Sequence, residues 1–235
     1  MSDLTLIGVY RERNAACMLD MVEQAAALGA DVRLHALGEV DRALARWTVD
    51  QGAGGRCLLL NQLYQGARRT GDVLVSDDDV DFCRGDLEQF LTVFARGGWD
   101  LAQPAHPWRG SHASYRFFLK RRPWLVSRDT TFVEIGPLFA VAEQARDTFL
   151  PLPDWGMGWG IELVWWDRAL EGARLGMVDD VTIRHLSPLF AGYGREAEER
   201  RLRSQLALRD LRSIRQIQRT VGTTPRWGLP GRKAA

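Results

Sequence analysis

The chain has 235 residues, 46% of them hydrophobic, so it can bury a substantial core and one domain is expected. Its formal net charge of +1 excludes the overall basicity that is typical of nucleic-acid-binding proteins. Cys17, Cys57 and Cys83 lack metal-ligand spacing and predict reduced thiols. We find neither a signal peptide nor an apolar run of membrane-spanning length. We therefore expect a cytoplasmic protein. A location at the inner face of the membrane is the alternative.

The opening of the chain has the pattern of a parallel α/β sheet. Leu4–Tyr10 predicts a buried strand, 15–28 a helix that ends at Gly29, and Asp31–Leu37 a second strand. The loop after the first strand holds Tyr10, Arg11 and Arg13 at the strand's carboxyl end, where α/β sheets bind nucleotides. These three residues are candidates for nucleotide contacts. A solvated loop in which Asn14 caps the helix is the alternative.

The middle of the chain alternates between helical and strand patterns. Helices are predicted over 43–49, 56–69, 86–96 and 161–171, strands over 73–75, 99–104, 131–141 and 177–186, and an irregular region over 105–128. These elements predict a single Rossmann-like α/β domain with a mixed, mostly parallel central sheet flanked by helices.

Three consecutive acids follow the apolar run Val73–Val75. Asp77, Asp78 and Asp79 are expected at the carboxyl edge of the sheet, where ligands sit in open α/β folds. Because like charges repel, such a cluster needs a cation or water among its carboxylates. Both a divalent metal that holds a phosphate group and a solvated acidic turn fit this stretch.

A second unusual stretch, Pro153–Glu162, contains three glycines and two tryptophans. Glu162 falls in the first turn of the predicted helix, where the helix dipole favours a carboxylate and where a general base can face a cleft. Asp154 is the competing candidate for that base. Further on, a strand ends at His185, which is either an ordinary hydrogen-bonded histidine or a metal ligand.

The chain ends in a basic tail. From Arg195 to Ala235 there are eleven Arg and Lys against four Asp and Glu. Residues 195–220 predict a helix with an apolar face, and residues 223–235 a loose end. We therefore divide the chain into a domain over 1–194 and a basic helical extension over 195–235. The helix either packs against its own domain, the commoner case, or makes peripheral contact with an anionic membrane.

Taken in order, these features resemble the GT-A glycosyltransferases of the family 2 type, over roughly Leu4 to Pro188. The resemblance rests on the α/β opening, an Asp-x-Asp that ends a strand, Trp-Gly-x-Glu over 159–162, and the late histidine. It implies that Asp77, Asp79 and His185 bind Mn²⁺ or Mg²⁺, and that Asp77 and Asp78 lie at the nucleotide sugar. It also implies that Glu162 is the base. Glu134 lies in another segment that an acceptor can contact.

The resemblance implies a metal-dependent, hexosyltransferase-type enzyme of bacterial glycan or glycoconjugate synthesis. It would move a sugar from a nucleotide-diphosphate donor to a hydroxyl of a glycan, lipid-linked or small-molecule acceptor. Such chemistry needs the leaving diphosphate neutralised and the acceptor hydroxyl deprotonated, and a histidine among the ligands suits Mn²⁺. A sugar-phosphate nucleotidyltransferase ranks second, because the loop after the first strand has no glycine. A non-catalytic nucleotide-sugar-binding domain is the third alternative, and retaining and inverting transfer both stay open.

Overall fold

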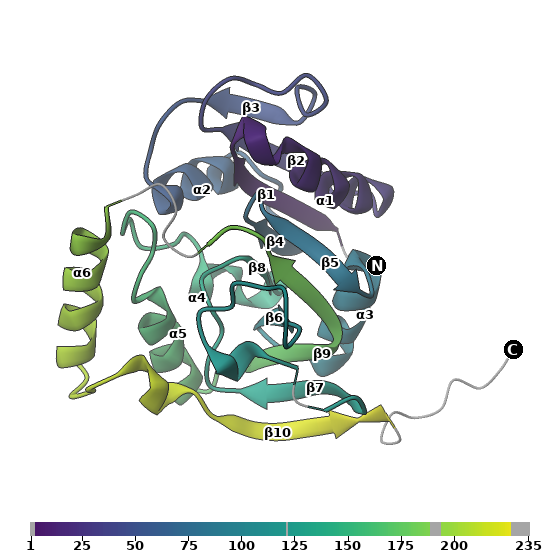
Figure 1. Ribbon diagram of the computed structural model, residues 1–235. Coiled ribbons are helices and arrows are strands. Elements are labelled where there is room, and N and C mark those ends of the chain that lie inside the picture. The colour runs from purple at the N-terminus through teal and green to yellow at the C-terminus, as the bar shows by residue number, and fades with distance from the viewer. Residues whose placement is uncertain (1–2, 121, 189–193, 227–235) are drawn as a thin grey trace, which may run out of the picture.

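The structure, a computed structural model, describes residues 3–120, 122–188 and 194–226 (Figure 1). Its strands are β1 (Leu4–Tyr10), β2 (Asp31–Ala36), β3 (Thr48–Gln51), β4 (Asp72–Ser76), β5 (Val80–Arg84), β6 (Leu101–Ala105), β7 (Leu125–Thr130), β8 (Leu138–Val141), β9 (Leu175–His185) and β10 (Thr220–Pro225). Its α-helices are α1 (Ala15–Ala27), α2 (Arg56–Gln65), α3 (Leu87–Gly97), α4 (Arg146–Phe149), α5 (Ile161–Leu170) and α6 (Arg195–Ala207). Short 3₁₀ turns are η1 (Glu12–Asn14), η2 (Arg116–Phe118), η3 (Glu143–Ala145) and η4 (Ile214–Ile217).

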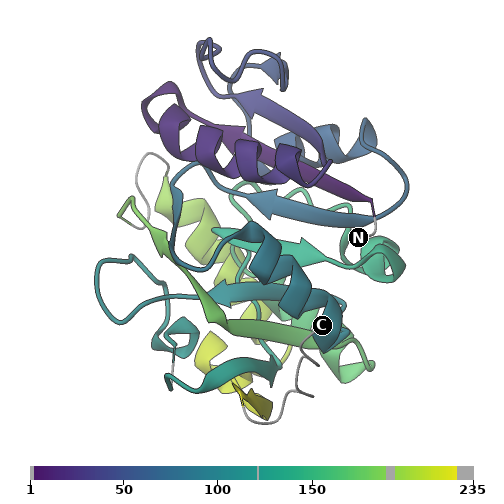
Figure 2. The same cartoon turned by 90° about the vertical axis from the view of Figure 1, so that its right-hand side faces the viewer.

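All these strands belong to one mixed sheet with the order β10-β7-β9-β6-β8-β4-β1-β2-β3, and β5 pairs with β9. Among the described residues, seven strands run in one direction, and β5, β7 and β8 run against them. Helices α1 and α3 cover one face of the sheet, and α2 and α5 cover the other (Figures 1 and 2). The predicted mixed, mostly parallel α/β architecture is confirmed.

Local sequence explains why the first elements form where they do. The near-continuous apolar run of β1 is buried because helices cover both faces of the parallel strands β2, β1 and β4. Helix α1 stops before Gly29, whose φ of 79° lies in the left-handed region. Helix α3 begins at Asp86, whose side chain accepts a hydrogen bond from the Gln89 backbone N–H at 2.8 Å. These termini agree with the predictions from sequence.

Several local predictions are wrong. The segment 43–47 forms turns instead of a helix, because Thr48 then pairs with β2 as the edge strand β3. Helix α2 ends at Gln65, four residues early, because Gly66 caps it. Asn14 makes no side-chain cap on α1, since a 3₁₀ turn precedes the helix. The region 105–128 includes η2 and the start of β7, and only Leu138–Val141 of the 131–141 stretch is a strand.

The described part of the basic tail, residues 195–226, packs against the rest of the chain and adds a strand to the sheet. Residues 195–207 form the predicted helix, but Thr220–Pro225, expected as the end of the helix and a loose segment, pair with β7 as β10. Residues 227–235 lie outside the described residues. A second apolar cluster joins the tail to the segments around η2 and after β7, and its buried members include Phe117, Phe118, Phe132, Ile214 and Ile217. None of the helices in the described ranges combines the length and apolarity that crossing a bilayer requires.

Candidate functional site

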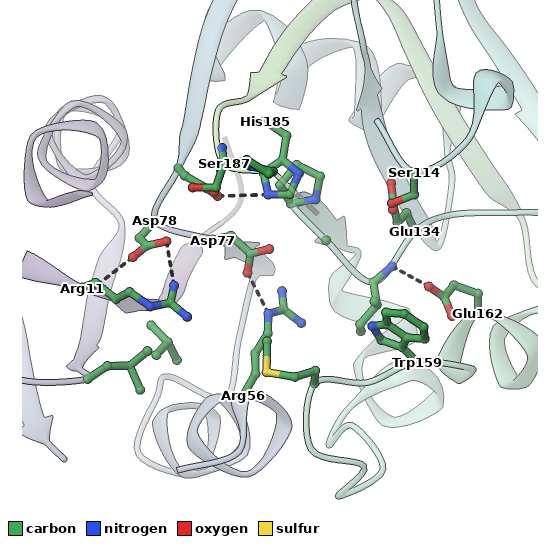
Figure 3. Close-up of a pocket in the computed structure, with 18 of the residues that line it drawn as sticks. Arg11, Arg56, Asp77, Asp78, Ser114, Glu134, Trp159, Glu162, His185 and Ser187 are labelled. Carbon is green, nitrogen blue, oxygen red and sulfur yellow. Dashed lines mark hydrogen bonds and ion pairs between the residues drawn. The ribbon is translucent and has the colours of Figure 1, made fainter. Parts of the chain in front are cut away.

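A cavity of about 600 Å³ opens at the carboxyl ends of β1 and β4 (Figure 3). Most of the residues singled out in the sequence line it. They are Arg11, Arg13, Asp77, Asp78, Asp79, Glu134, Glu162 and His185. The carboxyl edge of the parallel strands is where α/β folds bind ligands, so this cavity is the candidate active site.

Asp79 and His185 meet because β5 pairs with the end of β9. In this antiparallel pair Val80 lies opposite His185, and His185 Nε2 lies 3.2 Å from Asp79 Oδ1. The backbone N–H of Ser187 also donates to Asp79 Oδ2 at 3.2 Å. Burial acts to raise the pKa of Asp79, but the hydrogen bonds from His185 and Ser187 outweigh it and leave this pKa lowered. Burial acts to lower the pKa of His185, and the contact with Asp79 instead raises it to about 9.

Asp77 faces a different cation. Its Oδ1 accepts a hydrogen bond from Arg56 Nε at 2.7 Å, and its backbone N–H donates to the Pro137 carbonyl at 2.7 Å. A Cβ atom on Gly136 would lie 2.6 Å from Asp77 Oδ2, so this carboxylate packs directly against the glycine backbone. Arg56 was not singled out in the sequence, although it begins a helix right after the glycine-rich turn 52–55.

Asp78 holds the loop after β1 in place. Its Oδ2 accepts a hydrogen bond from the Arg11 backbone N–H at 2.7 Å, and the Arg11 guanidinium lies 3.7 Å from its Oδ1. Burial raises the pKa of Asp78, and the Arg11 hydrogen bond opposes that rise. The prediction for Tyr10 needs correction, because its side chain is fully buried and its hydroxyl lies 2.9 Å from Thr48 Oγ1, away from the cavity.

Glu162 lies in the first turn of α5 and is buried in the cavity wall. Its carboxylate accepts hydrogen bonds from the Gly160 N–H at 3.1 Å and from the Ile135 N–H at 3.5 Å (Figure 3). Burial raises the pKa of Glu162 to about 7, although these backbone donors act to lower it. Asp154, the other candidate base, is exposed and is not part of the cavity lining. Of the two candidates for the base that the sequence offered, only Glu162 lines the cavity.

The tail supplies a residue that the sequence did not point to. Glu198 of α6 is buried, and its carboxylate accepts hydrogen bonds from the backbone N–H groups of Met157 and Trp159 at 3.3 and 3.2 Å. Arg201 donates to Glu198 and to the Trp155 carbonyl, both at 2.9 Å. Helix α6 therefore holds the glycine- and tryptophan-rich loop that leads to Glu162.

No protein-family model matches the sequence, and no curated protein matches it. Solved structures do match. GalNAc-T7 with UDP, GalNAc and Mn²⁺ superposes with a TM-score of 0.61 at 11% identity, over 88% of this chain and 48% of that one. TarS 1-349 from S. aureus in complex with UDP gives 0.60 at 12% identity, over 90% and 66%. The mannosyltransferase PcManGT from Pyrobaculum calidifontis with GDP-Man and Mn²⁺ gives 0.60 at 14% identity, over 90% and 65%. The fold is GT-A-like.

The chain thus spans between about half and two thirds of the length of these GT-A structures. In its own GT-A-like site, the described residues contain no cluster of three or more His, Cys, Asp or Glu side chains that could hold a metal. Asp79 and His185 form an adjacent pair of hard-oxygen and imidazole donors, whereas Asp77 is bonded to Arg56. The three predicted metal ligands are therefore not gathered into one cluster, because only Asp79 and His185 are adjacent.

Proposed function

We propose that this chain is a metal-dependent glycosyltransferase that moves a sugar from a nucleotide-diphosphate donor to an acceptor hydroxyl. The observation that carries this proposal is the joint placement of two chemistries in one cavity. The Asp79–His185 pair lies on one side, and the buried carboxylate of Glu162 lies on the other. Sugar transfer needs both, because charge develops on the leaving diphosphate while the acceptor loses a proton.

A divalent cation fits the donor set of Asp79 and His185. Two protein ligands are few, but Mg²⁺ and Mn²⁺ commonly complete their coordination with phosphate oxygens and water. When bound, the cation would neutralise charge on the departing diphosphate. A nitrogen ligand favours Mn²⁺ over Mg²⁺. Two of the similar solved structures contain Mn²⁺, which supports a bound cation.

The nucleotide would occupy the part of the cavity next to β1. Val9 and Leu37 provide apolar surface there, and Arg11 and Arg13 provide positive charge. Asp78 keeps this loop in place through the Arg11 backbone. Proteins of similar fold were solved with UDP, UDP-GlcNAc or GDP-Man, which supports a nucleotide-sugar ligand without naming its base.

Glu162 would take the proton of the acceptor hydroxyl. Its two backbone hydrogen bonds fix the carboxylate, and a pKa of about 7 suits a base that works near neutral pH. Trp159 lines the same side of the cavity and offers a ring face on which a sugar can stack (Figure 3).

A thermal-shift panel of UDP-, GDP-, dTDP- and CDP-sugars, with and without Mn²⁺, tests the donor site. We expect one nucleotide class to stabilise the protein only with metal, by about 2.7 kcal/mol at a hundredfold excess over its Kd. Asp79→Asn should abolish this stabilisation. Asp81→Asn is the matched control, because Asp81 pairs with Arg184 and does not line the cavity.

The outcome of the panel separates the proposals. If no nucleotide sugar stabilises the protein in the presence of Mn²⁺, the donor site is refuted. If a nucleotide sugar binds but is never consumed with any of a broad set of saccharide acceptors or with water, a non-catalytic binding domain becomes the better account.

A further inference from the structure

Two carboxyl groups in the cavity lack the cationic partners that the others have. Each of the three consecutive aspartates faces a base. The pairs are Arg56–Asp77 at 2.7 Å, Arg11–Asp78 at 3.7 Å and His185–Asp79 at 3.2 Å. In the part of the chain that the structure describes, no basic side chain lies within ion-pair distance of Glu134 or Glu162. Glu162 has its two backbone donors, which leaves Glu134 as the group to explain.

Glu134 lines the cavity, and one oxygen of its carboxyl group is buried without a hydrogen-bond partner in the part of the chain that the structure describes. Its backbone N–H donates to the Oε1 atom of the buried Gln103 at 2.6 Å. The Ser114 hydroxyl lies close enough to this carboxyl group to act on its pKa, and Figure 3 shows the two side chains next to each other. The Glu134 side chain is more than nine-tenths buried, yet Oε2 has no hydrogen-bond partner among residues 3–120, 122–188 and 194–226. A buried oxygen without a partner is costly, so a ligand group that satisfies it is favoured.

The position of Glu134 indicates which ligand group that is. Glu134 lies close enough to Asp77 and His185, at the proposed diphosphate end, for their charges to shift its pKa. The charge of Glu162 also shifts this pKa. The residue after it, Ile135, donates its N–H to Glu162. The transferred sugar must lie between the leaving diphosphate and the base, and this is where Glu134 is placed.

We propose that Glu134 and Ser114 bind a hydroxyl group of the sugar unit of the nucleotide-sugar donor. The inference rests on the proposed function, because it takes Asp79 and His185 as the diphosphate end of the cavity. It assigns a recognition role within the site to two residues. One of them, Ser114, has no distinguishing pattern in the sequence.

The chemistry of the pair matches a hydroxyl group better than a phosphate. Burial raises the pKa of Glu134 to about 8; the Ser114 hydroxyl and the charge of His185 act to lower it, and Glu162 and Asp77 act to raise it. Near pH 7 the neutral acid therefore predominates. A neutral carboxyl group and a serine hydroxyl can each donate and accept, which is what a sugar hydroxyl requires.

The test compares binding of each nucleoside diphosphate with binding of its sugar ester. Calorimetry with Mn²⁺ would use the full chain and two ligand pairs, UDP with UDP-glucose and GDP with GDP-mannose. For the pair that the wild type binds, Glu134→Ala should weaken the nucleotide sugar about tenfold, the loss expected of one buried hydrogen bond. The Kd of the diphosphate alone should change less than about twofold, which also shows that the variant is folded.

Two further variants sharpen the result. Ser114→Ala should weaken the nucleotide sugar in the same selective way. Glu134→Gln still donates and accepts, so its nucleotide-sugar affinity should stay within about threefold of the wild type at pH 7. Equal weakening of both ligands in Glu134→Ala, or no weakening of either, overturns this inference and leaves the donor site standing. Failure of the wild type to bind any UDP-, GDP-, dTDP- or CDP-sugar in the presence of Mn²⁺ overturns both.

Discussion

Replacing Glu162 by Gln should raise the stability of the fold relative to the wild type as the pH increases, and it should abolish sugar transfer. The carboxyl group has a pKa of about 7 in the fold, raised by burial from an ordinary value of 4.5. Between these two values the unfolded chain binds fewer protons than the native state at this site. Stability from this group is therefore complete below pH 4.5 and is lost as the pH rises through about 7.

The size of the effect follows from the shift. A difference of about 2.5 pKa units corresponds to about 3 kcal/mol, at 1.36 kcal/mol per unit. Glutamine carries no charge at any pH; its amide oxygen can still accept the N–H of Gly160, but its NH2 group cannot accept the N–H of Ile135. The free energy of unfolding of Glu162→Gln, relative to that of the wild type, should therefore be about 3 kcal/mol higher at pH 8 than at pH 4.

Urea denaturation of both proteins at pH 4, 5.5, 7 and 8 measures this difference, and other titrating groups cancel in the comparison. Asp154→Asn is the matched control, because Asp154 is an exposed carboxylate in the same loop and surface changes stay within about 0.5 kcal/mol. In the transfer assay, wild-type kcat should rise with pH to a plateau above about 7. The variant should lose about 10²-fold or more. A stability difference that does not vary with pH would refute the reasoning.

Two further predictions concern the framework around the site. Arg128 and Asp179 form a fully buried ion pair at 2.7 Å, so Arg128→Met should lower the free energy of unfolding by about 3–5 kcal/mol in urea denaturation. The double variant with Asp179→Leu should recover part of this loss, and no recovery would contradict the pairing argument. Glu198→Ala should cost about 2–3 kcal/mol and lower kcat about tenfold or more, with nucleotide binding retained. Glu196→Ala on the same helix is the control and should behave as wild type.

The fold was predictable from sequence where local pattern and burial agree. The β1–α1–β2 unit has a continuous apolar strand, a helical period and a glycine stop, and the structure has all three. The short helix expected over 43–49 failed because edge pairing with β2 decides that segment. The strand β10 was missed for the same reason, since its partner β7 lies some ninety residues earlier in the chain.

The candidate site was predictable where its functional side chains lie at the ends of predicted strands. The resemblance to GT-A glycosyltransferases grouped Asp79 and His185 with Asp77, and the structure brings the side chains of Asp79 and His185 together. Tyr10 was misplaced because alternation along β1 turns its side chain to the core. The contact between Arg56 and Asp77 was not predictable from the sequence, because it depends on how α2 docks on the sheet.

Glu198 shows why the sequence pattern does not identify every residue of this site. In the sequence it is one of several acids among arginines, and its helix contains the i,i+4 pairs of an ordinary solvated face. In the fold its carboxylate instead binds two backbone N–H groups of the loop before α5, forty residues away. Because those donors precede Glu162, the position of the proposed base depends on whether α6 is docked. Helix α6 of the basic tail therefore helps to position the proposed base. Removing the tail should lower the rate of sugar transfer even when the nucleotide still binds.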